Sequence, residues 1–309
     1  MRAYAHGSFG EPGSVHDIDV PHPAAHEVRI RVVAASVNPV DWKISKGYLK
    51  DFIEHRFPLI SGQDFAGIVD AVGVDVRDLK EGDEVFGSHG QQFIGRGTHA
   101  EYVIANTMAV APKPVTLAGP QAASIPHAGV CGLMCVDAVE AGPGDTILIV
   151  GAAGGVGSFA VQIAVARGAR VIAVARTVNH EYLRKLGAAI TLDYERGDLV
   201  ESVRETSGGS LDGLIHLAGD ADTLRALSAL VPNGGMVASP VVAPMDDPRI
   251  RGTRIATQVT RERLEQLVSW IADGTLVLPE IRTFKLDEAR AAFQESEAGH
   301  VRGKLVLTT

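Results

Sequence analysis

Short β-rich runs separated by glycine and proline occupy the first third of the chain. Val28–Ala35 and Ala66–Val72 are rich in β-branched residues, and turn residues recur between such runs up to Pro120. Frequent turns between short apolar runs are typical of antiparallel strands. We therefore expect an irregular antiparallel β domain in this region.

After Pro120 the pattern changes to apolar strands that alternate with helical segments. The expected strands are Thr146–Val150, Arg170–Val174, Ile190–Leu192, Gly213–Leu217, Gly235–Ser239 and Arg254–Val259. The expected helices, each ending near a glycine as helix C-termini favour, are Val156–Arg167, Asn179–Leu186 and Arg261–Ala272. This alternation predicts an α/β fold with a doubly wound parallel sheet.

The last residues return to strand, helix and strand, at Ile281–Phe284, Asp287–Glu297 and Lys304–Leu307. This segment is too short for a domain of its own, so we expect it to pack on the first domain. The predicted organisation is a β-rich domain from residues 1–118 and 275–309, and a dinucleotide-binding domain from residues 119–274.

Composition narrows the classes of function. The chain of 309 residues carries a net charge of −8, which disfavours the basic surface that nucleic acids require. Its only cysteines, Cys131 and Cys135, are too few for a disulfide scaffold, and we expect reduced thiols. No apolar stretch reaches the roughly 20 residues of a membrane span. A cytoplasmic protein that binds a small molecule is the expectation.

The strongest motif is a glycine-rich turn between a predicted strand and helix. Thr146–Val150 runs into Gly151-Ala-Ala-Gly-Gly-Val-Gly157. Gly154 lets the backbone approach a pyrophosphate, Gly157 lets the helix pack closely on the strand, and the helix N-terminus supplies free N–H groups. A tight turn with no ligand is the alternative, which the surrounding βαβ pattern disfavours.

The next strand indicates which dinucleotide binds. A protein specific for NAD carries Asp or Glu at the end of this strand, where it binds the ribose 2′-hydroxyl. Here Arg170–Val174 is followed by Ala175 and Arg176, so a 2′-phosphate meets a positive charge. NADPH is the predicted cofactor. The alternative is that Arg176 is a solvated surface residue.

Several motifs in order resemble the quinone oxidoreductase branch of the medium-chain dehydrogenase/reductases. They are Ser36–Lys43, Gly62–Gly67, Gly82–Gly87, Ala128–Gly129, Gly151–Gly157, Gly187–Ala188 and Gly303–Leu307. The resemblance covers nearly the whole chain. It implies a GroES-like β domain built from two chain segments around a Rossmann domain, with nicotinamide and substrate in the cleft between them.

The same resemblance locates the positions of the catalytic zinc ligands of the alcohol dehydrogenases. They fall on Asn38, Gln63 and His127, and one imidazole cannot make a site that needs three or four Cys, His or carboxylate ligands. The segment between Gly87 and Ala100, where structural zinc would bind, contains no cysteine. We expect no metal, and we interpret His89 and His99 as ordinary loop histidines.

Without zinc, the resemblance implies hydride transfer to a quinone or an α,β-unsaturated carbonyl. The candidate catalytic residues are Asn38 as an amide donor, Lys43 as an enolate stabiliser, and His127 as a hydrogen-bond or proton donor. Each has a structural alternative, because Lys43 can pair with Asp41 and His127 can be a satisfied buried histidine. A solvent proton can also complete the reaction.

Other contacts are assigned by position in the family pattern. Besides Arg176, the candidate cofactor-binding residues are Ala152, Gly154, Gly155, Val156, Gly157, Asn179, Tyr194, Leu217, Ala218, Gly219, Ser239 and Lys304. Asn179 stands where relatives often have a basic residue. The candidate substrate-binding residues are Trp42, Tyr48, Phe52 and Met245.

Two other functions remain open on the sequence alone. One is a 2-enoyl-thioester reductase, which needs a basic entrance that the sequence does not show. The other is an NADPH-binding redox sensor or structural protein without turnover. For assembly we expect a homodimer through the edge strand Arg254–Val259 of the Rossmann sheet, because an unpaired edge can pair with a second copy.

Overall fold

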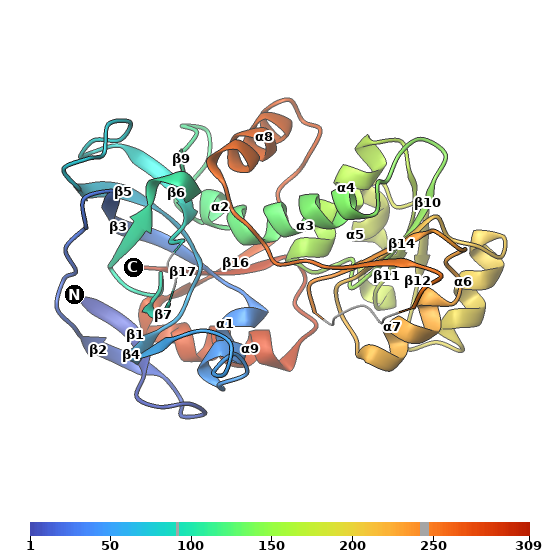
Figure 1. Ribbon diagram of the computed structural model, residues 1–309, viewed down its shortest axis with the longest axis horizontal. Coiled ribbons are helices and arrows are strands. Elements are labelled where there is room, and N and C mark those ends of the chain that lie inside the picture. The colour runs from blue at the N-terminus through green and yellow to red at the C-terminus, as the bar shows by residue number, and fades with distance from the viewer. Residues whose placement is uncertain (91–92, 242–246) are drawn as a thin grey trace. The chain divides into compact units, whose positions relative to one another are not determined.

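The computed structural model describes residues 1–90, 93–241 and 247–309 (Figure 1). Met245 lies outside these residues. The chain divides into two compact units. Unit 1 contains Met1–His127, Val259–Ser269 and Glu280–Thr309, and unit 2 contains Ala128–Gln258 and Trp270–Pro279.

The borders of the units differ from those expected at residues 118/119 and 274/275. Helix α2 (Gly119–Ala123) belongs to unit 1 because it packs on β3 (Glu27–Val37) and β5 (Asp64–Val72). The start of α8 (Arg261–Ala272) is tied to the same unit, since Arg261 forms an ion pair with Asp78 at 2.5 Å.

Unit 1 is built from two sheets. The described strands of the larger one follow the order β16-β17-β3-β5-β6-β9, with β8 also paired to β3, and those of the smaller one follow β2-β1-β4-β7. The remaining strands are β1 (Arg2–His6), β2 (Ser14–Asp17), β4 (His55–Ile60), β6 (Glu84–Ser88), β7 (Ile94–Arg96), β8 (Tyr102–Asn106), β9 (Val110–Pro112), β16 (Ile281–Lys285) and β17 (Lys304–Thr308). The helical elements are α1 (Pro39–Ser45), η1 (Thr107–Ala109), η3 (Leu286–Glu288) and α9 (Ala289–Ala298).

Alternation explains the core of the larger sheet. Val28, Ile30 and Val32 on β3 are buried, while the arginines between them are not. These residues pack with Phe65 and Val69 of β5, which is antiparallel to β3. Strand β17 pairs antiparallel with the end of β3, so the C-terminal segment completes this sheet as expected.

Unit 2 contains the predicted doubly wound sheet. Its described strands run parallel in the order β12-β11-β10-β13-β14-β15. Their bounds are β10 (Thr146–Val150), β11 (Arg170–Val174), β12 (Ile190–Leu192), β13 (Gly213–His216), β14 (Met236–Ser239) and β15 (Arg251–Arg254). The helical elements are α3 (Pro126–Ala138), which begins in unit 1, α4 (Gly155–Ala166), η2 (Thr177–Asn179), α5 (His180–Lys185), α6 (Leu199–Ser207) and α7 (Ala221–Ser228). The predicted α/β class is confirmed.

Helices cover the Rossmann sheet on each face. Leu148, Val150 and Leu214 pack against Val203 of α6 and Leu224 of α7 in one apolar cluster. Helix α4 instead contacts β10 and β11, and α5 contacts β12. Figure 1 shows these helices around the parallel strands. Among the described residues, no helix combines the length and apolar character needed to cross a bilayer.

The bounds of the sixth strand of this sheet differ from the prediction. We expected it at Arg254–Val259, but β15 comprises Arg251–Arg254, and all of its residues are exposed. The expected range was wrong because it followed the apolar residues Ile255 and Val259, whereas a strand at the edge of a sheet can form with all of its side chains exposed. After Ile255 N–H donates to Ser239 O at 3.0 Å, the chain leaves the ladder.

Candidate active site and cofactor site

The glycines of the loop between β10 and α4 have separate roles. Gly151 has φ +78°, a conformation that favours glycine. A Cβ added at Gly157 would lie 2.4 Å from the carbonyl oxygen of Gly151 and 2.5 Å from that of Ala152. A Cβ added at Gly154 would approach Gly151 O at 3.6 Å, and no other described atom within 4 Å. Gly157 is thus required for packing, while at Gly154 no described atom outside its chain neighbours lies closer than 3.6 Å to an added Cβ.

The N-terminus of α4 carries the hydrogen-bond donors of this loop. Gly154 is the N-cap and provides no side-chain cap, so the first N–H groups of the helix, at Gly155, Val156 and Gly157, have no intrahelical acceptor. Ala152, a candidate by sequence, is fully buried, and its N–H donates to Val174 O at 3.2 Å. The Ala152 N–H is therefore bound within the protein, and an anion contact at the helix start stays a prediction.

The end of β11 presents a positive charge. Arg176 is partly exposed, and no described carboxylate forms an ion pair with it. Its charge is close enough to lower the pKa of Tyr194, although burial and nearby acids raise that pKa further. Tyr194 is 43% exposed, and Asn179 is buried. Arg176 and Tyr194 are therefore both accessible, and their contact with a cofactor stays a prediction.

An acid that we had not identified lies at the same end of the sheet. Asp193 accepts hydrogen bonds from the backbone N–H and the hydroxyl of Thr177, and Arg196 lies 3.7 Å from its carboxylate. The hydroxyl of Thr177 is the main cause that lowers the pKa of Asp193 to about 2. The carboxylate thus stays charged and is bound to Thr177. Its place directly before Tyr194 was the only available signal.

The ends of β13 and β14 carry the other candidate cofactor contacts. Leu217 N–H donates to Val150 O at 3.0 Å, so the segment after β13 lies beside the glycine loop. Ala218 fills the space where a side chain at Gly151 would stand, and Gly219 has φ +103°. Ser239 is fully buried, and its hydroxyl accepts from Val241 N–H at 3.2 Å.

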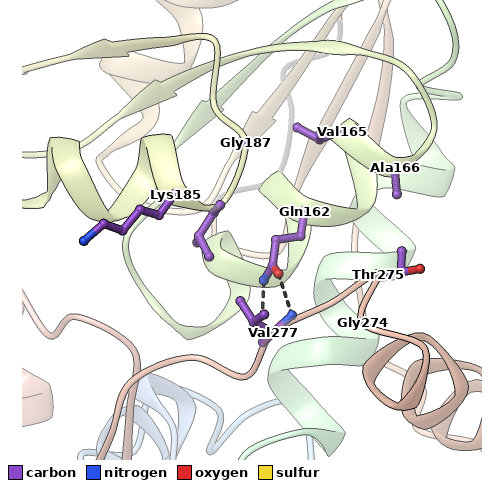
Figure 2. A pocket seen from close by; sticks show the side chains of 9 residues that line it. Gln162, Val165, Ala166, Lys185, Gly187, Gly274, Thr275 and Val277 are labelled. Atoms are coloured by element: carbon purple, nitrogen blue, oxygen red, sulfur yellow. Dashed lines mark hydrogen bonds between the residues drawn. The ribbon is translucent and has the colours of Figure 1, made fainter.

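A separate hollow in unit 2 lies along the C-terminal half of α4. Figure 2 shows Gln162 of this helix pointing to Val277, and Val165, Ala166 and Thr275 also line the hollow. The amide of Gln162 accepts from Val277 N–H at 2.7 Å and donates to Val277 O at 3.0 Å. Because both of its polar atoms are used, Gln162 offers nothing to a ligand, and we assign this hollow no role.

Unit 1 contains a buried polar cluster centred on Asp64. This carboxylate is fully buried at the start of β5. Its Oδ2 accepts from the Ser36 hydroxyl at 2.7 Å and from Asn38 Nδ2 at 3.0 Å, and its Oδ1 accepts from His127 N–H at 3.1 Å. Buried charges need such donors. Neither Asp64 nor Ser36 was a predicted site residue.

Two predicted residues, Asn38 and Lys304, contact each other in this cluster. Lys304 Nζ donates to Asn38 Oδ1 at 2.6 Å, and Asn38 Nδ2 also lies 3.3 Å from the Ser36 hydroxyl. Burial lowers the pKa of Lys304, while Asp64 and Asp41 raise it. Every polar atom of the Asn38 amide therefore has a partner within the protein.

Two histidines that we expected to be ordinary loop residues are buried, which corrects that interpretation. His99 is fully enclosed, with Nε2 at 3.1 Å from Ser36 O and Nδ1 at 3.4 Å from the Ser61 hydroxyl. Burial lowers the pKa of His99 and of His89 to about 4. The glycine-rich composition suggested a solvated loop, but Gly62 instead lets the chain pack directly against His99.

Asp41 occupies the N-terminus of α1 rather than pairing with Lys43. It is fully buried and accepts from Asn38 N–H at 2.7 Å. Burial is the main cause that raises the pKa of Asp41 to about 7. Lys43 forms no ion pair with a described residue, and its ammonium lies 5.5 Å from the centre of the Trp42 ring. Burial lowers the pKa of Lys43.

Of the predicted substrate-binding aromatics, Trp42 lies in α1, and Tyr48 and Phe52 follow the helix. Trp42 and Tyr48 make an edge contact with ring centres 6.0 Å apart. Tyr48 is 61% exposed and Phe52 is 83% exposed, so apolar surface is open to a ligand here. The imidazole of His127 is partly exposed at the start of α3, and burial is the main cause that lowers its pKa.

The part of the chain that the structure describes contains no cluster of three or more His, Cys, Asp or Glu side chains suited to a metal ion. Of the three expected zinc-ligand positions, His127 carries an imidazole, and Asn38 and Gln63 carry amides. Cys131 and Cys135 are buried free thiols.

Comparisons with known proteins agree with this architecture. The family model described as the alcohol dehydrogenase GroES-like domain matches residues 24–115, and that described as zinc-binding dehydrogenase matches residues 186–307. The chloroplastic quinone-oxidoreductase of Triphysaria versicolor is 30% identical over 330 residues, with 99% of this chain and 98% of that protein covered. The chloroplastic NADPH-dependent alkenal/one oxidoreductase of Arabidopsis thaliana is 30% identical over 318 residues, with 99% and 79% covered.

The quinone oxidoreductase from Coxiella burnetii is a similar solved structure. It has a TM-score of 0.91 and 32% identity, with 100% of this chain and 99% of that chain covered. The similarity thus extends over both units, and it agrees with the glycine loop, the sheet order and the GroES-like match. The chain belongs to the quinone oxidoreductase branch of the medium-chain dehydrogenase/reductase family.

Proposed function

We propose that the protein is an NADPH-dependent reductase that transfers hydride to a quinone or an α,β-unsaturated carbonyl without zinc. The observation that carries this proposal is Arg176, a cation without a carboxylate partner among the described residues, at the strand end beside an open glycine loop. The Arabidopsis relative, whose name includes NADPH dependence and alkenals, supports the same cofactor and acceptor class.

The residues of unit 2 fit a dinucleotide with a 2′-phosphate. The N–H groups of Gly155, Val156 and Gly157 would hold the pyrophosphate, because they have no intrahelical acceptor and lie at the positive end of the α4 dipole. Arg176 and Tyr194 would hold the 2′-phosphate. The segments Leu217–Gly219 and Ser239 remain the proposed contacts for the ribose and nicotinamide. When bound, the nicotinamide supplies the hydride.

The donors in unit 1 support the proposed zinc independence. Asn38 stands at a zinc-ligand position, but Lys304 and Asp64 already engage its amide atoms. A metal ion at Asn38 would have to displace the ammonium of Lys304. We infer that this ammonium, held at 2.6 Å from Asn38 Oδ1, provides the positive charge here.

The acceptor needs an orienting surface and a group that stabilises charge on its carbonyl oxygen. Trp42, Tyr48 and Phe52 offer flat apolar surface for a ring or an alkene. Lys43 and His127 are the proposed polar groups. His127 is held neutral by its lowered pKa, so it can donate one N–H to the oxygen. Lys43 brings a cation that no described carboxylate neutralises. Asn38 is retained as a catalytic-site residue whose amide orients the others.

A screen of NADPH consumption tests the function. The wild-type protein, before and after dialysis against a chelator, is assayed with quinones, alkenals and enoyl thioesters, with NADH in parallel. We expect oxidation of NADPH with quinones or alkenals that is unchanged by the chelator. Activity confined to enoyl thioesters would indicate a thioester reductase, and NADPH binding without turnover would indicate a sensor or structural protein. If the purified protein contained stoichiometric zinc and dialysis against the chelator abolished activity, metal independence would be wrong. We also propose that the protein acts in the cytoplasm.

A further inference from the structure

Asp64 gathers donors from three separate parts of unit 1. The Ser36 hydroxyl comes from β3, the Asn38 amide precedes α1, and the His127 N–H opens α3. Two of these three residues are proposed members of the catalytic site. The carboxylate itself is fully buried, so it has no access to solvent and acts through its neighbours.

Charge determines how the Asn38 amide is oriented. A lysine ammonium only donates hydrogen bonds, and an ionised carboxylate only accepts them. Lys304 Nζ at 2.6 Å must therefore face Asn38 Oδ1, and Asp64 Oδ2 at 3.0 Å must face Asn38 Nδ2. The reversed amide would place donor against donor and acceptor against acceptor. The two opposite charges thus hold the amide in one orientation.

We propose that Asp64 is a positioning residue, which together with the ammonium of Lys304 fixes the amide of Asn38 and the first turn of α3 that carries His127. The expected effect of Asp64 on catalysis rests on the proposed reductase function, whereas its expected effect on the fold does not.

The substitution Asp64→Asn tests this at nearly constant volume. Oδ2 of Asp64 receives donors from Ser36 and Asn38, whereas Oδ1 receives only the His127 N–H. The amide of the variant keeps its oxygen at the site of the two donors and turns its NH2 group toward His127, where donor meets donor. The variant therefore loses its bond to α3, and Lys304 loses one of its two nearby counter-charges.

A control exists on the same strand. Asp70 also lies on β5 and forms an ion pair with Arg29 at 2.6 Å, outside the cluster. We expect Asp64→Asn to lower kcat about 10- to 100-fold, with the Kd for NADPH within about twofold of wild type. Asp70→Asn should leave kcat within about twofold. Equal kcat in the two variants, or a loss in Asp64→Asn that appears only as weaker NADPH binding, would overturn the proposal.

A double-variant cycle tests the network without any activity. Urea unfolding is compared for wild type, Asp64→Asn, Lys304→Met and the double variant. In the double variant neither Asp64 nor Lys304 remains as a buried ion without the other, so this variant should be less destabilised than the sum of the single shifts in urea midpoint. Additive shifts would show that the two groups do not act together and would overturn the proposal. Should wild type reduce no acceptor, the proposed function fails, while this cycle still decides whether Asp64 and Lys304 hold Asn38.

Discussion

Burial sets the protonation of several side chains in unit 1. His89 and His99 have pKa values lowered to about 4, so they are neutral at pH 7, and the pKa of Asp41 is raised to about 7. These residues share no sequence pattern that marks them as buried, since Asp41 lies between Val40 and Trp42 and His99 between Thr98 and Ala100. Gly62 packs against His99, and Asp41 lies in the first turn of α1, and this tertiary packing is the source of their burial.

These shifts predict how stability depends on pH. The lowered pKa values of His89 and His99 give stability that is present above pH 6.5 and is lost as the pH falls toward 4. The raised pKa of Asp41 acts oppositely, because its stabilising protonated form is lost as the pH rises through about 7. The two histidines outweigh the single aspartate, so the free energy of unfolding should decrease on acidification from pH 6.5 to 4.5.

Removing Asp41 should make this loss steeper. In Asp41→Asn the opposing group is absent, so the slope between pH 6.5 and 4.5 should increase by about 1 kcal/mol per pH unit, the value for one titrating group. Urea unfolding at several pH values measures it. Asp17→Asn, at an exposed position of β2, is the control. Parallel curves for wild type and Asp41→Asn would contradict the assignment.

The preference for NADPH over NADH is also predicted to depend on one residue, Arg176. Arg176→Ala should weaken NADPH binding by about 1.5–3 kcal/mol, the range for a hydrogen bond to a charged group, and leave NADH binding nearly unchanged. Fluorescence titration with both cofactors measures the difference. Arg184→Ala removes an exposed arginine of α5 whose guanidinium donates to Thr191, and should change neither affinity. An equal loss for NADPH and NADH in Arg176→Ala would refute the role of Arg176.

At the scale of elements, the contact between β10 and α4 depends on the loop that joins them. The helix begins so close to the strand that a methyl group at Gly157 would clash with the backbone oxygens of Gly151 and Ala152. Backbone atoms cannot move aside as the end of a flexible side chain can. Gly154 lies only three residues earlier, yet its open side belongs to the proposed pyrophosphate site. We therefore predict that Gly157 serves stability and that Gly154 serves cofactor binding.

Matched alanine variants separate these two roles. Gly157→Ala should lower the free energy of unfolding by about 1–3 kcal/mol, the usual cost of overpacking. At Gly154 the φ of −74° is compatible with alanine, so Gly154→Ala should change the free energy of unfolding by under about 1 kcal/mol. The same variant should weaken NADPH binding tenfold or more, because the added methyl group would occupy the space proposed for the pyrophosphate. Urea unfolding and NADPH titration test both. A stability loss in Gly154→Ala larger than in Gly157→Ala would contradict the division.

At the scale of the whole molecule, β15 is the last of the described strands of the Rossmann sheet, and no described strand pairs with its outer edge. Arg251 N–H donates inward to Gly235 O at 2.9 Å, and Ile255 N–H donates inward to Ser239 O at 3.0 Å. Because alternate residues of a strand turn to opposite sides, Gly252 and Arg254 direct their N–H groups to the open edge. We propose that a second copy pairs antiparallel there and forms a homodimer.

Proline scanning of this edge tests the dimer. Light scattering of wild type at micromolar concentration should give twice the chain mass of 32.6 kDa. Arg254→Pro removes an outward N–H and should yield a monomer, because proline cannot donate to the ladder between copies. Thr257→Pro lies beyond β15 and should leave the dimer intact. A wild-type mass of one chain would exclude the dimer, and a dimer that survives in Arg254→Pro would exclude this edge as its interface.

The sequence by itself determined the features that depend on neighbouring residues. The glycine loop, the strands β10 and β11 and the arginine after β11 could be predicted, because turn conformation, strand propensity and the N-terminus of a helix are local properties. The family motifs identified Asn38, His127 and Lys304 as candidates. They did not indicate what these side chains contact.

Only the tertiary structure decided those contacts. Asn38 and Lys304 are separated by 266 residues, and Asp64 reaches His127 across 63 residues, so no local pattern records their hydrogen bonds. The burial of His89 and His99 and the true bounds of β15 were also missed, because burial depends on which distant segments cover a residue. A fully buried carboxylate is stable only where several distant donors converge on it, and that convergence is a property of the folded chain.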